Sequence, residues 1–316
     1  MTLGVAADVV AQSSPKVYRI GWLGNGSPPS GTANVSDFEQ GLRDRGYVDR
    51  QNVVIEYQFA KGDPAQLSRS AAELARLKVD VIVTSGEPAA LAAQRATSTI
   101  PIITTEFGFD PVKAGLVASL GKPGGNVTGL ASISEELWEK RLATLKVLVP
   151  RLARLSVLWN PANPGNVTCL AEIQRAARSM GLQDMPLEAR DGNALDRALA
   201  GIGRDSTDAL AICWDTVTLE QARTIGDFAL KRRLPTLAPL KEFVEAGCLM
   251  SYGPSLPAHR RRIAYYVDRI LKGAMPAGLA VEQPTAFDLV INQSTAKTLG
   301  IAVPPNLLLL VDELLP

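Results

Sequence analysis

Histidine and cysteine are scarce in this chain of 316 residues, which contains one histidine and three cysteines. His259, Cys169, Cys213 and Cys248 lie far apart in the sequence and show none of the spacings that are typical of metal sites. The sequence therefore predicts no metal site. Each cysteine fits the pattern of a small buried apolar residue. A Cys213–Cys248 disulfide between two strands is an alternative that the sequence leaves open.

Long apolar runs, a basic stripe and catalytic motifs are also lacking. No internal run reaches the length of about eighteen apolar residues that predicts a membrane span. A net charge of +1 without clustered basic and aromatic residues excludes nucleic acid as an expected partner. The glycine-rich segment 24–31 fails the dinucleotide fingerprint, because Pro29 stands where the third glycine is needed. No nucleophile elbow or zinc motif occurs, and His259 beside three arginines indicates a solvated helix face. We therefore expect no enzyme activity and no cofactor.

What is present is ordinary globular composition, with 46% hydrophobic and 21% charged residues. The length favours two domains of about 150 residues each. Residues 1–16 form a separate segment: an apolar stretch followed by small, polar residues resembles the tail of a secretory signal peptide without its basic start. We expect residues 1–16 to be a signal-peptide remnant or a disordered tail.

The stretch from Lys78 to Asp110 organises the chain. Residues 79–83 are a short β-branched apolar run that ends in Thr84-Ser85-Gly86, which predicts a strand buried on both faces of a parallel sheet. Glu87-Pro88 opens a helix, and 101–105 is the next strand. Because ligands bind at the carboxyl ends of strands in open α/β sheets, these two neighbouring strand ends predict a binding edge.

The order of elements in this first half returns in the second half. The same spacing separates Asp63 from Asp80 and Asp191 from Asp208. We predict an α/β protein with two doubly wound, Rossmann-like lobes of like topology, joined by a three-segment hinge. The expected N-terminal lobe comprises 17–127 plus 253–284, and the C-terminal lobe comprises 128–252 plus 285–316.

Several stretches of the chain resemble a known family. They include Gly41–Val48, Val79–Thr84, Asp110-Pro111-Val112, Trp159-Asn160-Pro161 and Leu249–Gly253, and the most specific is Lys122-Pro123-Gly124-Gly125-Asn126-Val127-Thr128-Gly129. From about Tyr18 to Ala302 the sequence resembles an ABC-transporter substrate-binding protein of the tryptophan/tyrosine-binding type. The resemblance implies the type I periplasmic-binding-protein architecture, a clamp that closes on a small ligand. It also implies that the partners are the membrane subunits of an ABC permease. It further implies that the protein catalyses no reaction.

An α-amino acid needs donors for its carboxylate and an anion for its ammonium group. Ser85 with the N–H groups of Gly86 and Glu87 is the candidate for the carboxylate, and Thr105 with Thr104 completes it. By analogy with amino-acid binders of this fold, Asp215 would hold the ammonium group. The alternatives are structural: Ser85 as a helix cap, one threonine packed in the sheet, and Asp215 capping the helix at Thr216.

Two glutamates complicate this site, because Glu87 and Glu106 add negative charge where a carboxylate is expected. Either they point to solvent, or the ligand has a cationic or hydroxyl-rich end. Aromatic residues in strand-end loops are candidates for stacking on a ring, and amides and hydroxyls nearby for hydrogen bonds. The candidates beyond those named above are Asn25, Ser27, Phe107, Asn160, Trp214, Ser251 and Tyr252, with Trp22, Phe109 and Asn163 as weaker ones.

The leading functional hypothesis is a periplasmic solute-binding receptor of an ABC importer. It would capture an amino acid or aromatic compound between its lobes and deliver it to the permease. We expect a monomer. The alternatives are a ligand-sensing protein, the effector-binding core of a repressor, and a two-domain α/β enzyme.

Overall fold

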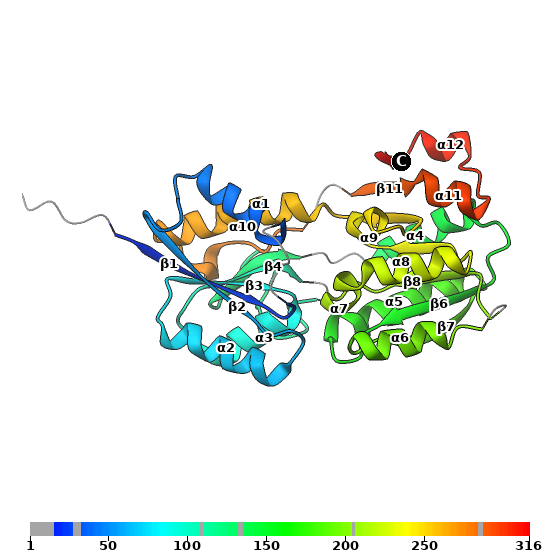
Figure 1. Cartoon of the computed structure of the whole chain (residues 1–316). Coiled ribbons are helices and arrows are strands. Elements are labelled where there is room, and N and C mark those ends of the chain that lie inside the picture. Colours follow the sequence, from blue (N-terminus) through cyan, green and yellow to red (C-terminus); the bar gives the residue numbers. More distant parts are fainter. Residues whose placement is uncertain (1–15, 28–32, 108–109, 132–134, 204–205, 284–286) are drawn as a thin grey trace, which may run out of the picture.

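The computed structural model describes residues 16–27, 33–107, 110–131, 135–203, 206–283 and 287–316. The expected signal-peptide remnant therefore falls almost entirely outside the described residues. The described chain forms two α/β lobes that lie side by side (Figure 1).

The N-terminal lobe contains a five-stranded parallel sheet with the order β2-β1-β3-β4-β5. Its strands are β1 (Tyr18–Gly24), β2 (Val53–Phe59), β3 (Val81–Ser85), β4 (Ile102–Phe107) and β5 (Val127–Ala131). Val81 and Val83 pack on one face of this sheet and Ile82 on the other, because successive side chains of a strand alternate. The apolar run that predicted a strand buried on both faces is thus β3.

Helices cover both faces of this sheet. Helices α2 (Pro64–Arg76) and α3 (Glu87–Ala96) pack on one face. Helices α1 (Ala33–Arg43) and α10 (Leu256–Leu271) pack on the other, and a short 3-10 helix, Pro276–Gly278, follows α10. Helix α10 lies far along the sequence from the rest of this lobe, so the chain returns to it (Figure 1).

The C-terminal lobe contains a seven-stranded sheet with the order β12-β11-β10-β9-β8-β6-β7. All its neighbouring strands are parallel except β10 and β11. The strands are β6 (Arg154–Trp159), β7 (Gln183–Glu188), β8 (Ala209–Ile212), β9 (Thr236–Ala238), β10 (Met250–Gly253), β11 (Asp288–Asn292) and β12 (Glu313–Leu315).

Two groups of helices sandwich this second sheet. One face carries α4 (Glu135–Leu148), α5 (Pro164–Ser179), α11 (Gln293–Leu299) and α12 (Pro305–Leu308). The other carries α6 (Gly192–Ala200), α7 (Thr216–Glu220), α8 (Ala222–Lys231) and α9 (Lys241–Glu245). The order β7-β6-β8-β9-β10 repeats the order β2-β1-β3-β4-β5, which confirms two doubly wound lobes of like topology.

Three crossovers join the lobes: from β5 to α4, from β10 to α10, and from Glu282 to β11. Val127–Ala131 pairs with β4 and so extends the N-terminal sheet. Leu130 in β5 and Glu282 form a parallel β-bridge, so the segments that lead into the first and third crossovers lie beside each other.

Candidate functional site

A cavity of about 270 Å³ lies between the lobes at the carboxyl ends of their strands. Its N-terminal-lobe wall comes from the ends of β1, β2, β3 and β4 and from helix α1. Its opposite wall comes from the loop after β8, from α7 and from α9, and the start of α10, which returns to the N-terminal lobe, completes the lining. The described lining residues are Trp22, Gly24, Gly26, Ser27, Val35, Phe59, Ser85, Thr105, Trp214, Thr216, Leu219, Glu220, Glu242, His259 and Arg260.

Five of the candidate residues line this cavity, namely Ser27, Ser85, Thr105 and Trp214 and the weaker candidate Trp22. Ser85 ends β3, and Gly86 after it has a φ of 86°, a left-handed conformation that favours glycine. Gly86 is the cap residue of α3, and no side-chain hydrogen bond caps this helix. Ser85 therefore lines the cavity and does not serve as the helix cap.

Other candidates lie close by without reaching this cavity. Asn25 is half-buried beside the β1 end, where its carbonyl accepts from the N–H of Gly62 at 2.7 Å. Glu87 is buried, with 1% of its surface exposed, so it does not point to solvent. Glu106 and Phe107 end β4, but their side chains lie outside the described part of the chain, as does Phe109.

Asp215 has its carboxylate fully engaged within the C-terminal lobe. It accepts from Asn160 Nδ2 at 3.0 Å and from Asn163 Nδ2 at 2.8 Å. Its Oδ1 also accepts from the N–H of Val217 at 2.9 Å, and with Thr218 it forms a capping box at the start of α7. Asp215 is 1% exposed and is not among the described residues that line the cavity. Asp215 thus caps α7, the alternative that the sequence left open for it, and Asn160 donates to its carboxylate.

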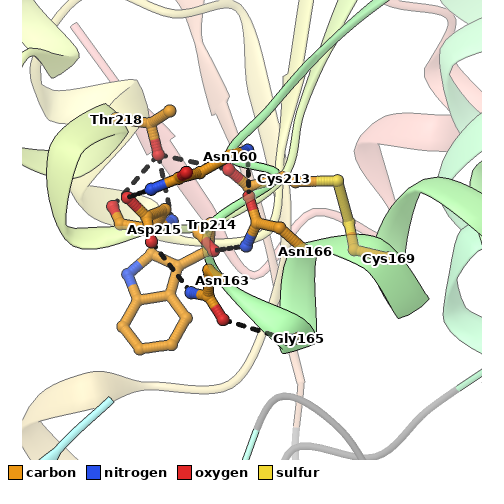
Figure 2. The surroundings of a disulfide bond; sticks show 9 residues. All are labelled: Asn160, Asn163, Gly165, Asn166, Cys169, Cys213, Trp214, Asp215 and Thr218. Atoms are coloured by element: carbon orange, nitrogen blue, oxygen red, sulfur yellow. Dashed lines mark hydrogen bonds between the residues drawn. A yellow bond between two sulfur atoms is a disulfide. The ribbon is translucent and has the colours of Figure 1, made fainter. Parts of the chain in front are cut away.

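A disulfide joins Cys169 in α5 to Cys213 directly after β8, with their Cα atoms 6.1 Å apart (Figure 2). The alternative Cys213–Cys248 pairing is therefore wrong. Cys213 packs on the α5 face of the sheet, whereas the free, buried Cys248 packs with Phe243 and Leu240 on the opposite face. Because the sheet separates them, these two sulfur atoms cannot meet.

Ser251 and Tyr252 in β10 are also held inside the C-terminal lobe. The Tyr252 hydroxyl accepts from Lys140 Nζ at 2.6 Å, and its carbonyl accepts from Arg141 Nε at 2.7 Å. Ser251 is 1% exposed. Neither is among the described residues that line the cavity, so α4 is the neighbour of Tyr252 rather than a ligand in this space.

The charged residues of the cavity wall were not among the site residues predicted from the sequence. Glu220, Glu242 and Arg260 line the cavity, and His259 lies beside them, 9% exposed. The expectation of a solvated face for His259 is wrong, because α10 begins at the cleft, where the chain crosses back to the N-terminal lobe. The one available signal was position: Glu242 and His259 both follow strand ends of the second sheet.

Burial changes the protonation of two of these groups. Burial lowers the pKa of His259 to about 4, and the neighbouring Arg260 charge adds to the effect, so this imidazole is neutral near pH 7. Burial also raises the pKa of Glu242 above its usual value, while the positive charge of Arg260 works in the opposite direction. The wall thus combines one guanidinium, one neutral imidazole and two carboxyl groups.

Two contacts join the lobes directly. The backbone N–H of Ser27 donates to Glu220 Oε1 at 2.6 Å. The carboxyl group of Glu87 at the start of α3 lies against Gly165 at the start of α5. Direct contacts between the lobes are typical of the closed state of a two-lobe clamp.

The described residues offer neither a membrane span nor a metal centre. Within them, every helix is too short or too polar to cross a bilayer. The same part of the chain contains no cluster of three or more histidine, cysteine, aspartate or glutamate residues that could hold a metal ion.

Comparison with known proteins supplies the family. Residues 27–315 match the family described as ABC transporter substrate binding protein. A tyrosine-binding protein of Clostridioides difficile is 27% identical over 265 residues, which are 84% of this chain and 75% of the relative.

Two solved structures are similar over nearly the whole chain. An ABC domain from Streptococcus pneumonia in complex with L-Trp has a TM-score of 0.87 at 25% identity, covering 95% of this chain and 100% of that one. The ligand-free, open structure of a substrate binding protein with adhesive properties from Clostridium difficile has a TM-score of 0.66 at 25% identity, covering 95% and 99%. With nearly its full length matched by the family, this chain belongs to the ABC transporter substrate binding proteins.

Proposed function

We propose that this protein is an extracytoplasmic receptor for an aromatic amino acid, which it delivers to the permease of an ABC importer. The observation that carries the proposal is the composition of the cavity wall. It joins three aromatic rings, one guanidinium and two carboxyl groups around a space of about 270 Å³. A small molecule with a ring, an anionic end and a cationic end matches this wall.

The aromatic part of the wall comes from both lobes. Trp22 and Phe59 contribute from β1 and β2, and Trp214 contributes from the loop after β8. Rings stack well on other rings and exclude water from the contact. A ligand ring held between the lobes would therefore favour the closed state over the open state, which is how a ligand shifts such an equilibrium.

The charged part of the wall suits the zwitterionic end of an amino acid. Arg260 supplies a guanidinium for a carboxylate, and Glu220 and Glu242 supply carboxyl groups for an ammonium ion. The raised pKa of Glu242 is consistent with a buried carboxyl that a ligand cation would stabilise in its charged form. This assignment moves the ammonium partner from Asp215 to α7 and α9.

Two further observations support the proposal. The chain resembles the L-Trp-bound domain more closely than the ligand-free, open structure, with TM-scores of 0.87 and 0.66, in line with its interlobe contacts. The Cys169–Cys213 disulfide fits an oxidising compartment outside the cytoplasm. The relatives named for tyrosine and L-Trp bind ligands of the proposed class.

Isothermal titration calorimetry with L-tryptophan, L-tyrosine and L-phenylalanine tests the ligand class. Tryptamine lacks the carboxylate and indole-3-propionate lacks the ammonium group, so each removes one end of the zwitterion. We expect at least one aromatic amino acid to bind and each truncated analogue to bind at least about tenfold more weakly, since each lacks one of the two charged groups that the wall would contact. Equal binding of the truncated analogues, or no binding of any aromatic amino acid, would contradict the proposal.

A further inference from the structure

Three consecutive residues after β8 are each tied to the segment that contains α5 (Figure 2). Cys213 is joined to Cys169 by the disulfide. The carbonyl of Trp214 accepts from Asn166 Nδ2 at 2.6 Å. The carboxylate of Asp215 accepts from Asn160 and Asn163. We call residues 213–215 the anchored tripeptide.

The anchors come from one short stretch of chain. Asn166 and Cys169 are three residues apart in α5, so they lie on the same face of this helix. Asn166 also accepts from the backbone N–H of Asn160 at 2.9 Å, which links the loop before α5 to the same face. The anchors therefore act as one unit on the tripeptide.

Thr218 in α7 also forms hydrogen bonds with the backbone of the anchored tripeptide. Thr218 Oγ1 donates to the carbonyl of Cys213 at 3.1 Å, and it accepts from the N–H of Asp215 at 3.0 Å. All these groups are buried: Cys213, Asp215, Asn166 and Thr218 are each exposed by 2% or less. Hydrogen bonds in such surroundings hold their geometry, because water does not compete for them.

The Trp214 indole is the one side chain of the anchored tripeptide that lines the cavity. The Trp214 indole lies on one side of the tripeptide and the disulfide on the other (Figure 2), and Trp214 lines the cavity between the lobes. Helix α7, which Asp215 caps, supplies Thr216, Leu219 and Glu220 to the same wall. Fixing the tripeptide therefore fixes an aromatic ring and a carboxyl group of the candidate site.

We propose that the Cys169–Cys213 disulfide and Asn166 are positioning residues of the ligand site, which hold Trp214 and α7 in the binding geometry before the ligand arrives. The inference rests on the proposed function for its ligand. It assigns the disulfide a role in affinity in addition to any role in stability. When the binding-competent geometry is populated only in part, the apparent Kd rises by the inverse of that fraction.

The test compares the Cys169→Ala/Cys213→Ala double variant with the wild type and with Cys248→Ala. Cys248 is a matched control, since it is also buried but packs against the sheet face away from α5. Asn166→Ala, which keeps the disulfide, carries the test if the double variant does not fold. Kd for L-tryptophan and L-tyrosine is measured by calorimetry far below each melting temperature, where a loss of stability alone does not change it.

We expect Kd to rise about tenfold in the double variant and in Asn166→Ala, as it would if the loop held its binding geometry about a tenth of the time. Kd should be unchanged in Cys248→Ala. If the melting temperature of the double variant falls while its Kd equals that of the wild type, the disulfide stabilises the fold without affecting affinity, and the inference is overturned.

Amide hydrogen exchange without ligand separates this inference from the proposed function. The N–H groups of Val217 and Leu219 bond to Asp215, so we expect them to exchange faster in the double variant and in Asn166→Ala. Unchanged exchange at these amides would overturn the inference even if Kd changed. If wild type binds neither probe, the proposed ligand class fails, and exchange alone then decides whether the anchors hold the loop.

Discussion

The carboxyl group of Glu87 in the N-terminal lobe lies directly against Gly165 in the C-terminal lobe. A Cβ atom at Gly165 would stand 2.8 Å from Glu87 Oε1. A reciprocal contact occurs across the cavity, where a Cβ atom at Gly26 would stand 2.6 Å from Glu220 Oε1. Each glycine follows the first strand of its own lobe, and each glutamate belongs to the helix after strand β3 or β8, which hold equivalent positions in the two sheets.

Gly165→Ala is expected to weaken closure. The added methyl group meets the Glu87 carboxyl, and such overpacking costs about 1–3 kcal/mol. The cost falls on the closed state, because Gly165 has no positive φ and alanine is the better helix former at the start of α5. Small-angle X-ray scattering should show a larger radius of gyration, and calorimetry a higher Kd for the amino acid that wild type binds.

Gly121→Ala is the matched control for this prediction. A Cβ atom at Gly121 would meet nothing within 4 Å, so the variant should behave as wild type. If Gly165→Ala binds its ligand as tightly as Gly121→Ala does, the Glu87–Gly165 contact has no influence on closure.

Loss of the disulfide should lower the free energy of unfolding of the C-terminal lobe. The two cysteines are 44 residues apart, and a cross-link of this length is worth up to about 4 kcal/mol by restricting the unfolded chain. Urea titration of Cys169→Ala/Cys213→Ala, followed by circular dichroism, measures the change. A midpoint equal to that of Cys248→Ala would speak against any stabilisation by this bridge.

Asp215→Asn separates two roles for this residue. The substitution turns one acceptor into a donor that faces Asn163 Nδ2, which should cost about 1–3 kcal/mol in the free energy of unfolding. If Asp215 acts only by holding α7 in place, its variant should lose affinity for L-tryptophan and indole-3-propionate by the same factor. A loss confined to the ligand with an ammonium group would instead place the carboxylate against that group.

His259 should make stability depend on pH. Its pKa is lowered from 6.5 to about 4 by burial, so below pH 6.5 the unfolded chain takes up a proton that the folded chain refuses. The free energy of unfolding should therefore fall as pH decreases from about 6.5 to about 4, by as much as about 3 kcal/mol.

The variant His259→Gln provides the comparison for this titration. Carboxyl groups that titrate in the same range, Glu242 among them, remain in both proteins and cancel in the difference. The difference in unfolding free energy between wild type and His259→Gln should change between pH 6.5 and pH 4. Parallel pH curves for the two proteins would show that the imidazole is not excluded from protonation.

Much of the fold was accessible from local sequence patterns. The β-branched run before Ser85 predicted β3 because a strand buried on both faces needs apolar residues at successive positions. The repeated order of elements predicted two like lobes, because the same order of strands and helices folds into the same topology. The glycine-rich stretch after Lys122 leads into β5, where Gly129 is required because a Cβ atom there would stand 2.7 Å from Thr104 N in β4.

The sequence by itself determined the two lobes and the strand ends that bring Ser27, Ser85, Thr105 and Trp214 to the cavity. Those features follow from periodicity and turn chemistry, which act between residues close in the chain. Only the tertiary structure decided that Cys169 pairs with Cys213, that Asp215 is enclosed by asparagines, and that Glu220, Glu242 and His259 face the cavity. These contacts join residues far apart in the sequence, so they depend on how helices pack on the sheets and on how one lobe closes against the other.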